Sequence, residues 1–245
     1  MADMVRLYSS DFDFMTRDIL PYRQYLFAAS ARTGSTYLSL LMWKSGLLGA
    51  PMEYLNFDNS SGIFQRLGNG DPVLYWQELK RHRSTVNGVF GFKMFVGNYK
   101  NTLRLYPELV SHIYGDPVIY LQRRDKIAQA VSLLKAIQSK SWFSVDPLRE
   151  APQYDFAKLL KCYQQGLQQD EEWQKIFALT EARVIDLVYE DYILEPPSVV
   201  DHIIDEMKLD RSQACEVPDF ELIEKQADHI NQEWYERFKM DFAKL

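Results

Sequence analysis

The architecture of this chain follows from one stretch, Tyr25-Leu26-Phe27-Ala28-Ala29-Ser30-Ala31-Arg32-Thr33-Gly34-Ser35-Thr36-Tyr37-Leu38. An apolar run ends at small polar residues, turns at one glycine and resumes with the pattern of a buried helix. A strand, a loop and a helix N-terminus in this order point backbone N–H groups and the positive end of the helix dipole at an anion. Arg32 adds a cation to the loop, yet the ATP-binding pattern G-x-x-x-x-G-K-[ST] is absent. Residues 30–36, the anion loop, therefore predict an anion site without the signature of a nucleoside triphosphate.

Outward from the anion loop, short apolar runs alternate with helical patterns. The runs predict strands over residues 24–29, 89–95, 117–121 and 184–188. Helices are predicted over residues 35–45, 72–83, 107–114, from Asp125 onward, 154–180 with a break near Gly166 left open, 195–207 and 219–242. Residues 59–71 are expected to form a surface excursion, and residues 142–152 a loop.

This alternation determines the expected fold class. It favours a parallel sheet covered by helices on both faces. We therefore expect an α/β protein with a P-loop-like three-layer α/β/α arrangement around a central, mainly parallel sheet. No internal repeat and no linker marks a second domain, so residues 1–245 are expected to form one domain.

Composition narrows the function classes. The chain has 245 residues, of which 47% are hydrophobic, and its net charge of −6 excludes the basic footprint of a nucleic-acid-binding protein. The four histidines and the two isolated cysteines show no ligand spacing, so no metal site is expected. The N-terminus lacks an apolar signal segment, and no stretch approaches the roughly 20 apolar residues of a membrane span. A cytoplasmic location is therefore expected.

Polar residues that suggest chemistry occur at three places. The anion loop is the first. The second is Arg123-Arg124-Asp125 at the end of a predicted strand, with Ser132 eight residues after Arg124; a guanidinium and a hydroxyl suit a phosphate monoester. The third is Glu53, a carboxylate beyond the helix that leaves the anion loop and a candidate general base. Each has a structural alternative: an ordinary turn with a surface arginine, a salt bridge at a helix start, and a solvated acid.

Together these pieces resemble the sulfotransferases that use 3′-phosphoadenosine-5′-phosphosulfate (PAPS), and more specifically the bacterial trehalose 2-sulfotransferase-like (Stf-type) carbohydrate sulfotransferases. The anion loop is similar to their 5′-phosphosulfate loop, with Arg32 where many members carry lysine, and the spacing from Arg124 to Ser132 is similar to their 3′-phosphate-binding pair. Further matching stretches follow in family order up to about residue 192: Gly49-Ala50-Pro51-Met52-Glu53-Tyr54, Gly91-Phe92-Lys93-Met94, Gln129-Ala130-Val131-Ser132, Ala136-Ile137-Gln138 to Trp142, and Tyr189-Glu190-Asp191. Near the end of the chain, Gln226-Ala227-Asp228 and Asn231-Gln232-Glu233-Trp234 also look similar to the family.

The resemblance implies the sulfotransferase fold and in-line transfer of a sulfuryl group from PAPS, without a metal, to a carbohydrate or glycolipid hydroxyl. It implies that Glu53 is the general base and that Arg124 and Ser132 hold the 3′-phosphate. The residues implied to hold the 5′-phosphosulfate are Ser30, Arg32, Thr33, Gly34, Ser35 and Thr36. Arg32 also receives a catalytic role, because it and the helix N-terminus can stabilise the negative charge that gathers on the leaving nucleotide.

Two departures from the family pattern are expected to touch the acceptor side. Ala50 stands where an acidic residue is expected, and Phe95-Val96-Gly97 is less polar than the trehalose enzyme, so the acceptor stays open. Four aromatic residues could stack on a sugar ring or pack in the core: Tyr54, Phe57, Phe95 and Trp142. A homodimer is also open, with the apolar helix over residues 35–45 and the region of Trp76 as candidate surfaces.

Two other interpretations of the anion site stay open. A P-loop kinase or nucleotidase shares the strand–loop–helix geometry, although the Walker lysine and a clear metal-binding acid after a strand are missing. A non-catalytic nucleotide-binding module on the same fold would bind nucleotide without needing Glu53 as a base.

Overall fold

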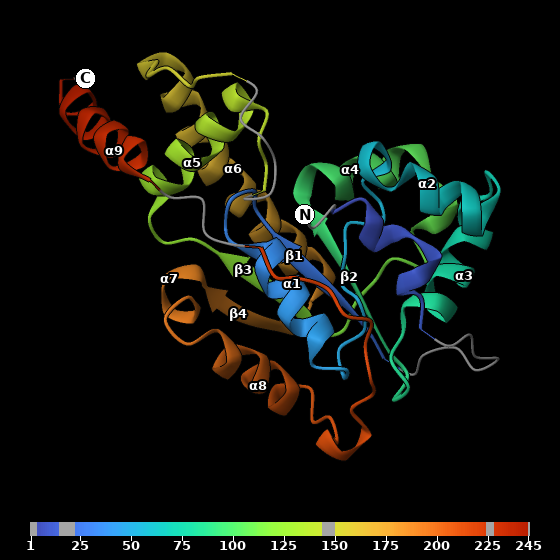
Figure 1. Cartoon of the computed structure of the whole chain (residues 1–245). Coiled ribbons are helices and arrows are strands. Elements are labelled where there is room, and N and C mark those ends of the chain that lie inside the picture. Colours follow the sequence, from blue (N-terminus) through green and yellow to red (C-terminus); the bar gives the residue numbers. More distant parts are fainter. Residues whose placement is uncertain (1–3, 15–22, 144–149, 224–227, 245) are drawn as a thin grey trace.

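The structure, a computed structural model, describes residues 4–14, 23–143, 150–223 and 228–244 (Figure 1). Among these residues, four strands form one sheet: β1 (Arg23–Ala29), β2 (Val89–Phe95), β3 (Val118–Gln122) and β4 (Val184–Val188). The strand order is β2-β1-β3-β4, and every neighbouring pair is parallel. The strands predicted from the apolar runs are confirmed to within one residue at each end.

Helices connect the strands. They are α1 (Ser35–Lys44), α2 (Phe57–Gly68), α3 (Pro72–Arg83), α4 (Val96–Leu105), α5 (Lys126–Ser139), α6 (Phe156–Thr180), α7 (Tyr189–Tyr192), α8 (Pro196–Glu206) and α9 (His229–Phe242). Short 3-10 turns lie at η1 (Arg6–Tyr8), η2 (Ser10–Phe12), η3 (Pro107–Leu109) and η4 (Arg211–Gln213). Asp125 accepts a hydrogen bond from a backbone N–H in the first turn of α5, as expected for an N-cap. Throughout the described part of the chain, no helix is both long and apolar enough to cross a membrane.

Alternating side chains of β1 enter two cores on opposite faces of the sheet. Tyr25, Phe27 and Ala29 pack in the core that contains residues of α1 and α8. Leu26 and Ala28 pack on the other face, in the core that contains residues of α3 and α6. Helices therefore cover both faces, and the predicted three-layer α/β/α fold is confirmed.

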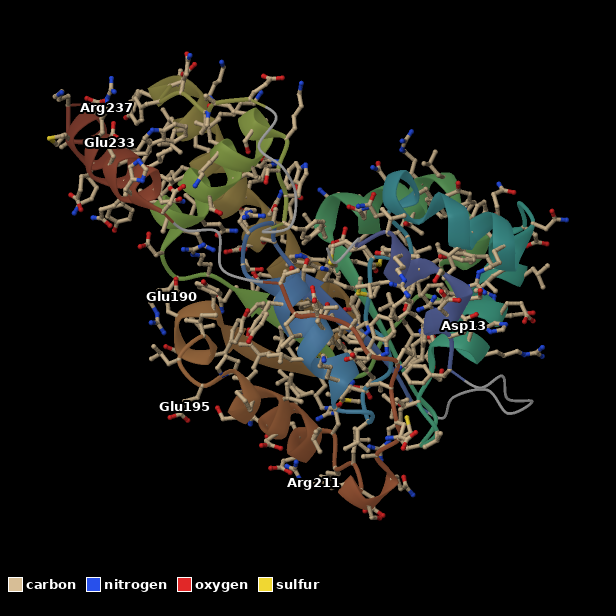
Figure 2. All side chains as sticks on the ribbon, in the orientation of Figure 1. Asp13, Glu190, Glu195, Arg211, Glu233 and Arg237 are labelled. Carbon is tan, nitrogen blue, oxygen red and sulfur yellow. The ribbon has the colours of Figure 1, made fainter. Side chains whose placement is uncertain are left out.

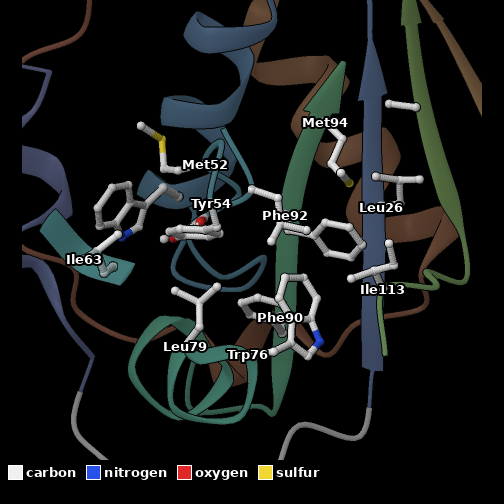
Figure 3. Close-up of a cluster of buried hydrophobic side chains, with 14 of the residues drawn as sticks. Leu26, Met52, Tyr54, Ile63, Trp76, Leu79, Phe90, Phe92, Met94 and Ile113 are labelled. Atoms are coloured by element: carbon white, nitrogen blue, oxygen red, sulfur yellow. The ribbon is translucent and has the colours of Figure 1, made fainter. Parts of the chain in front are cut away.

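Figure 3 shows the aromatic packing on the face that α3 covers. The ring of Trp76 stands edge-on to Phe90 and Phe92 of β2, with centroids 5.4 and 5.0 Å apart. Trp76 is fully buried there, and most of α1 is buried between the sheet and α8. The side chain of Trp76 and the buried residues of α1 therefore cannot form a dimer surface, while a homodimer as such stays a prediction.

Several segments differ from the sequence-based expectations. Residues 57–68 form α2 instead of a surface excursion, because Ile63 and Leu67 recur at helical spacing and pack in the core. Helix α4, which was not predicted, begins directly after β2, and Pro107 opens a short 3-10 turn instead of the helix predicted over residues 107–114. Helix α6 runs unbroken through Gly166, which is buried.

A third core joins α5, α6 and α9 at one end of the molecule (Figure 1). Trp234 and Phe238 supply the buried face of α9. The helix predicted from Asp219 onward begins only after Asp228, whose carboxylate caps it in a capping box. The Gln226-Ala227 part of the family-like motif lies outside the described residues.

All four strands end at the same edge of the sheet, because all are parallel. The chain continues from this edge into the anion loop after β1, into α4 after β2, into Arg123-Arg124-Asp125 after β3 and into α7 after β4. Ligands of parallel α/β sheets bind at this edge.

Candidate active site

A cavity of about 1200 Å³ opens at the carboxyl edge of the sheet. Its walls come from the anion loop, the connection before α2, the segment after β3, α5, α7 and the start of α9. Residues predicted from the sequence that line it are Arg32, Gly34, Ser35, Thr36, Glu53 and Ser132. The structure therefore brings the anion loop, the candidate base and the candidate phosphate-binding serine to one cavity.

Internal and external hydrogen bonds shape the anion loop. Arg32 and Gly34 have φ values of 64° and 77°, so the backbone turns sharply before α1. The Thr33 hydroxyl donates to the Ser30 carbonyl at 2.8 Å and closes the turn. From α5, Gln129 Nε2 donates to the Ala31 carbonyl at 2.8 Å. The loop is thus held so that the first turn of α1, with its N–H donors, lines the cavity.

Gly34 has no room for a side chain. A Cβ at this position would overlap the Tyr192 hydroxyl and lie 2.8 Å from the ring of Tyr189. The same Tyr192 hydroxyl donates to the Gly34 carbonyl at 2.8 Å. The two tyrosines of α7 therefore pack directly on the anion loop and require glycine there.

The side chains of Ser30 and Thr33 face the protein interior. Both residues are fully buried, and Ser30 Oγ donates to Asp170 Oδ1 of α6 at 2.8 Å. Asp170 also pairs with Lys126 of α5. The resemblance placed these two residues among those that hold the 5′-phosphosulfate. In the structure, their hydroxyls support the anion loop from the side that faces the protein interior.

Two guanidinium groups stand together beside the loop. Arg123 Nη1 donates to the Arg32 carbonyl at 3.1 Å, and the Arg123 guanidinium lies 4.6 Å from the centre of the Tyr189 ring. Burial and the positive charge of Arg123 lower the pKa of Arg32 to about 10. Arg32 is still charged at neutral pH, so two cations that repel each other line the same cavity. An anion placed near both relieves that repulsion.

Arg123 was not among the predicted ligands. Its Nε lies 3.8 Å from Glu190 Oε1, beyond hydrogen-bond distance. Strand alternation explains where it points: Leu121 packs in the core with Tyr189, and Arg123, two residues later, continues on that face. The alternation of side chains along the predicted strand, with a period of two residues, was the signal in the sequence that pointed to Arg123.

Arg124 lies outside the cavity. Its side chain is 64% exposed, and its Nη2 donates to both carboxylate oxygens of Asp191, at 3.1 and 2.8 Å. Ser132 accepts a hydrogen bond from Arg32 Nε instead, at 2.9 Å. The structure thus brings Ser132 to Arg32 and does not bring it to Arg124.

Glu190 fixes the segment that carries both arginines, and Figure 2 shows it on α7. Its carboxylate accepts the backbone N–H groups of Arg124 and Asp125, each at 3.0 Å. Partial burial alone would raise the pKa of Glu190, but the two N–H donors outweigh it and the pKa lies below its ordinary value. Each residue of Tyr189-Glu190-Asp191 therefore contacts Arg123 or Arg124.

Glu53 lies in the connection between α1 and α2, and donors orient its carboxylate. Oε1 lies 3.0 Å from Lys93 Nζ, and Oε2 accepts a hydrogen bond from Asn56 Nδ2 at 2.9 Å. The Lys93 side chain is fully buried and also donates to Thr36 Oγ1 at 2.9 Å. Each carboxylate oxygen has two lone pairs, so an oriented Glu53 can still accept a proton from a ligand in the cavity.

Lys93 is the second site residue missing from the predicted set. It belongs to a stretch that was expected to be a buried strand, and β2 is buried along nearly its whole length. Lysine is almost never fully buried unless it is paired. A lysine within an apolar strand therefore predicts a nearby carboxylate, although the sequence does not say which.

Only some of the residues expected on the acceptor side line the cavity. Phe95 and Trp142 line the cavity, whereas Tyr54 is fully buried in the core and Phe57 packs against that core. Ala50 is fully buried in the same core, so the expectation that this position touches the acceptor is wrong. Of the two departures from the family pattern, only the second places a residue, Phe95, in the cavity wall.

Metal-binding side chains do not gather anywhere in the described ranges. No group of three or more His, Cys, Asp or Glu residues there could hold a metal ion. Both cysteines are free thiols: Cys162 is buried in the third core, and Cys215 Sγ lies 3.2 Å from the Gly46 carbonyl.

Comparison with known proteins gives one family. The family model described as Stf0 sulphotransferase matches residues 24–241. Two curated relatives are trehalose 2-sulfotransferases. The protein from Mycolicibacterium smegmatis is 26% identical over 256 residues, which cover 89% of this chain and 94% of the relative. The protein from Mycobacterium tuberculosis is 24% identical over 262 residues, which cover 91% of this chain and 97% of the relative.

Solved structures include two with the same coverage of this chain. The sulfotransferase from Alicyclobacillus acidocaldarius has a TM-score of 0.48 at 13% identity, covering 92% of this chain and 95% of its own. The sulfotransferase domain of the Synechococcus PCC 7002 olefin synthase also has a TM-score of 0.48 at 13% identity, covering 92% and 98%.

Proposed function

Because the chain belongs to the Stf0 sulphotransferase family, we propose that it transfers a sulfuryl group from PAPS to a hydroxyl of a carbohydrate or glycolipid. The observation that carries the proposal is the single cavity lined by the anion loop, Arg123 and Glu53. A site for an anionic donor and a base for a hydroxyl acceptor then share one space. The family membership also decides against the kinase or nucleotidase alternative.

The groups around the anion loop suit a phosphosulfate. The first turn of α1 offers backbone N–H donors together with the hydroxyls of Ser35 and Thr36, and Arg32 and Arg123 supply positive charge. When bound, PAPS supplies a sulfuryl group attached to a phosphate leaving group. Arg32 and the N-terminus of α1 would stabilise the negative charge that develops on the oxygen between sulfur and phosphorus.

For the 3′-phosphate we propose Ser132 and Arg124, the pair that the resemblance implies. Arg124 would have to leave Asp191 to reach the cavity. The two side chains of that ion pair are 64% and 63% exposed, and pairs this exposed contribute only about 0–1 kcal/mol. A phosphate dianion can therefore compete for Arg124 at little cost in free energy.

Glu53 is proposed as the general base. As the acceptor oxygen forms its bond to sulfur and the bond from sulfur to the leaving phosphate oxygen breaks, the hydroxyl proton passes to Glu53. Lys93 and Asn56 hold the two carboxylate oxygens at 3.0 and 2.9 Å, which orients the base before the acceptor arrives.

The acceptor class rests on the relatives and on the cavity wall. Both curated relatives are trehalose 2-sulfotransferases. Phe95 and Trp142 place aromatic surface in the cavity, which suits the apolar face of a sugar ring.

The test incubates the protein with radiolabelled PAPS and a panel of trehalose, other sugars and lipid-linked glycans. We expect label transfer to at least one glycan, lost when Glu53 is replaced by Gln. Transfer to none of them, together with magnesium-dependent ATP binding, would overturn the proposal. Bisphosphate binding with sulfation unchanged in Glu53→Gln would reject the base and keep the donor.

A further inference from the structure

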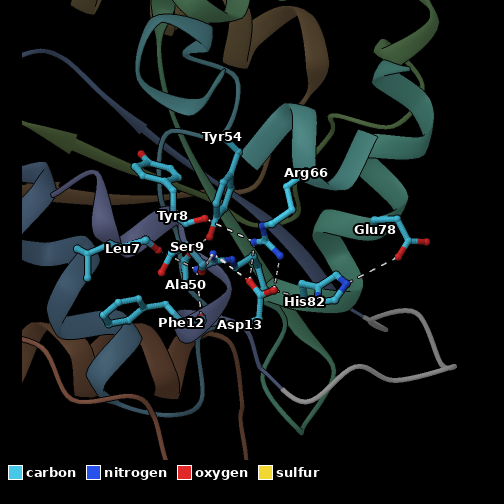
Figure 4. Close-up of polar contacts among 11 residues, drawn as sticks. Leu7, Tyr8, Ser9, Phe12, Asp13, Ala50, Tyr54, Arg66, Glu78 and His82 are labelled. Atoms are coloured by element: carbon cyan, nitrogen blue, oxygen red, sulfur yellow. Dashed lines mark hydrogen bonds and ion pairs between the residues drawn. The ribbon is translucent and has the colours of Figure 1, made fainter. Parts of the chain in front are cut away.

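The described residues 4–14, the N-terminal segment, precede the part of the chain that the family model matches, which begins at residue 24. The N-terminal segment nevertheless packs beside the connection that carries the candidate base, and Figure 4 shows Tyr8 next to Tyr54, the residue that follows Glu53. The Tyr8 hydroxyl accepts a hydrogen bond from the backbone N–H of Glu53 at 3.3 Å. The Tyr8 ring also meets Tyr54 edge-on, with centroids 6.0 Å apart. Tyr8 therefore contacts the connection that carries Glu53 through both its hydroxyl and its ring.

A buried arginine holds the N-terminal segment in place. The Arg83 side chain at the end of α3 has no exposed surface. Its guanidinium donates to the carbonyls of Leu7, Ser9 and Phe12 at 3.0, 3.0 and 3.1 Å, and it pairs with Asp13 at 3.0 Å. Chain ends near a terminus fray unless they are tied down in this way.

Asp13 extends the anchor to a second helix. Arg66 of α2 binds both of its carboxylate oxygens, at 2.6 and 2.9 Å, and His82 Nδ1 lies 3.2 Å away (Figure 4). Arg66 is only 31% exposed and Asp13 only 11%. The N-terminal segment is thus fixed to α2 and α3, the two helices that follow Glu53 in the chain.

Glu53 needs such support because no regular element carries it. The connection between α1 and α2 pairs with the sheet at one isolated bridge, Met52 with Phe92, where Lys93 N–H donates to the Met52 carbonyl at 2.9 Å. The hydrogen bond from Glu53 N–H to Tyr8 is the next fixed point along the chain. A catalytic group placed on a connection requires neighbours that lock its geometry.

We propose that Tyr8 is a positioning residue for Glu53, so that the N-terminal segment is a working part of the active site. The inference rests on the proposed role of Glu53 as the base. Burial and the negative charge of Glu53 raise the pKa of Tyr8 well above its ordinary value, so the hydroxyl remains neutral beside the carboxylate.

The test replaces Tyr8 by Phe, which removes the hydroxyl and keeps the ring against Tyr54. We expect kcat for sulfation to fall about five- to tenfold, the effect of one lost positioning hydrogen bond. Affinity for adenosine 3′,5′-bisphosphate should stay the same, because Tyr8 acts on the connection that carries Glu53 and not on the anion loop. Tyr25→Phe is the matched control: its hydroxyl donates to the Leu48 carbonyl at 2.7 Å inside the other core, so kcat should not change.

A double-variant cycle separates positioning from general loss of stability. In a Glu53→Gln background, adding Tyr8→Phe should leave the residual transfer of radiolabel unchanged, because the base through which Tyr8 acts is gone. Unchanged kcat in Tyr8→Phe, or an equal loss in both backgrounds, would overturn the inference while leaving the proposed function intact. Full activity of Glu53→Gln alone would instead reject the proposed base.

Discussion

Lys93 and Glu53 form an ion pair, Nζ to Oε1 at 3.0 Å, in which the lysine side chain is entirely buried. The same ammonium group donates to Thr36 Oγ1 at 2.9 Å. Because Thr36 lies in the first turn of α1, a single side chain joins the proposed base to the anion loop. The geometry of the acceptor side and that of the donor side are therefore coupled.

Lys93→Met tests this coupling. The variant leaves Glu53 without its cation and Thr36 without its donor, so we expect kcat to fall about ten- to a hundredfold and the free energy of unfolding to fall by about 1–3 kcal/mol. Steady-state kinetics and thermal unfolding measure the two effects. Lys100→Met is the control, because Lys100 is 54% exposed and pairs with Glu172 away from the cavity; it should change neither. Wild-type kcat in Lys93→Met would contradict the coupling.

Glu53→Gln tests the base. We expect kcat to fall by about two to four orders of magnitude, the usual contribution of general base catalysis, because the amide of Gln cannot take up the proton of the sugar hydroxyl. Binding of adenosine 3′,5′-bisphosphate, followed by calorimetry, should barely change. Glu171→Gln removes an equal charge on the exposed surface of α6 and should retain full activity. A large loss of bisphosphate affinity in Glu53→Gln would show a structural role for the carboxylate instead.

Gly34→Ala tests the shape of the anion loop. Its Cβ would lie 2.8 Å from the Tyr189 ring, and its φ of 77° disfavours alanine, so we expect bisphosphate affinity to fall at least tenfold. Gly70 makes a matched control, since it has a φ of 89° and no atom within 4 Å of an added Cβ. Gly70→Ala should cost about 1 kcal/mol of stability and leave affinity unchanged. Equal bisphosphate affinities for the two variants would show that the close contact between Gly34 and α7 does not matter for anion binding.

Arg32→Met tests how much stability the folded protein loses because it buries the charged guanidinium of Arg32 in the cavity. Burial, and after it the positive charge of Arg123, lower the pKa of Arg32 from its ordinary value to about 10. The charged form is therefore penalised in the folded protein at neutral pH, and the penalty is lost as the pH rises above about 10, where the folded protein releases this proton before the unfolded chain does. We expect the variant without ligand to gain about 1–2 kcal/mol, since roughly 3 kcal/mol of charge burial is removed and the hydrogen bonds to Ser132 and Trp142 are lost. Denaturant unfolding at pH 7 measures the change, and a clear loss of stability would contradict it.

The strands and the edge at which ligands bind were predictable, because buried strands read as short apolar runs and parallel strands end together. The site was predictable only in part. Spacing along the chain assigns the phosphate to Arg124, whereas the structure places Arg123 in the cavity and Arg124 on Asp191. Arg123 and Arg124 both follow the last residue of β3 and contact different residues of α7, and the spacing to Ser132 does not choose between them.

The parts of the site that the sequence did not predict depend on contacts between segments that lie far apart in the chain. Tyr8 and Glu53 lie 45 positions apart, and Lys93 meets Thr36 across 57 positions. Such pairs depend on how β1 and β2 align and on where the N-terminal segment packs, which no local pattern specifies. Helix α2 was missed for a related reason, since its helical form is stabilised by burying Ile63 and Leu67 in the core.

The measurement that tests the central claim most directly is a calorimetric titration of adenosine 3′,5′-bisphosphate into the wild-type protein, Arg32→Met and Arg124→Ala. We expect the wild type to bind in the low micromolar to millimolar range. Arg32→Met should bind about ten- to a hundredfold more weakly, because it loses a charge-assisted contact to the phosphate, and Arg124→Ala should also bind more weakly. Absence of binding to the wild type, or equal affinity in all three proteins, would contradict the assignment of the anion loop as the donor site.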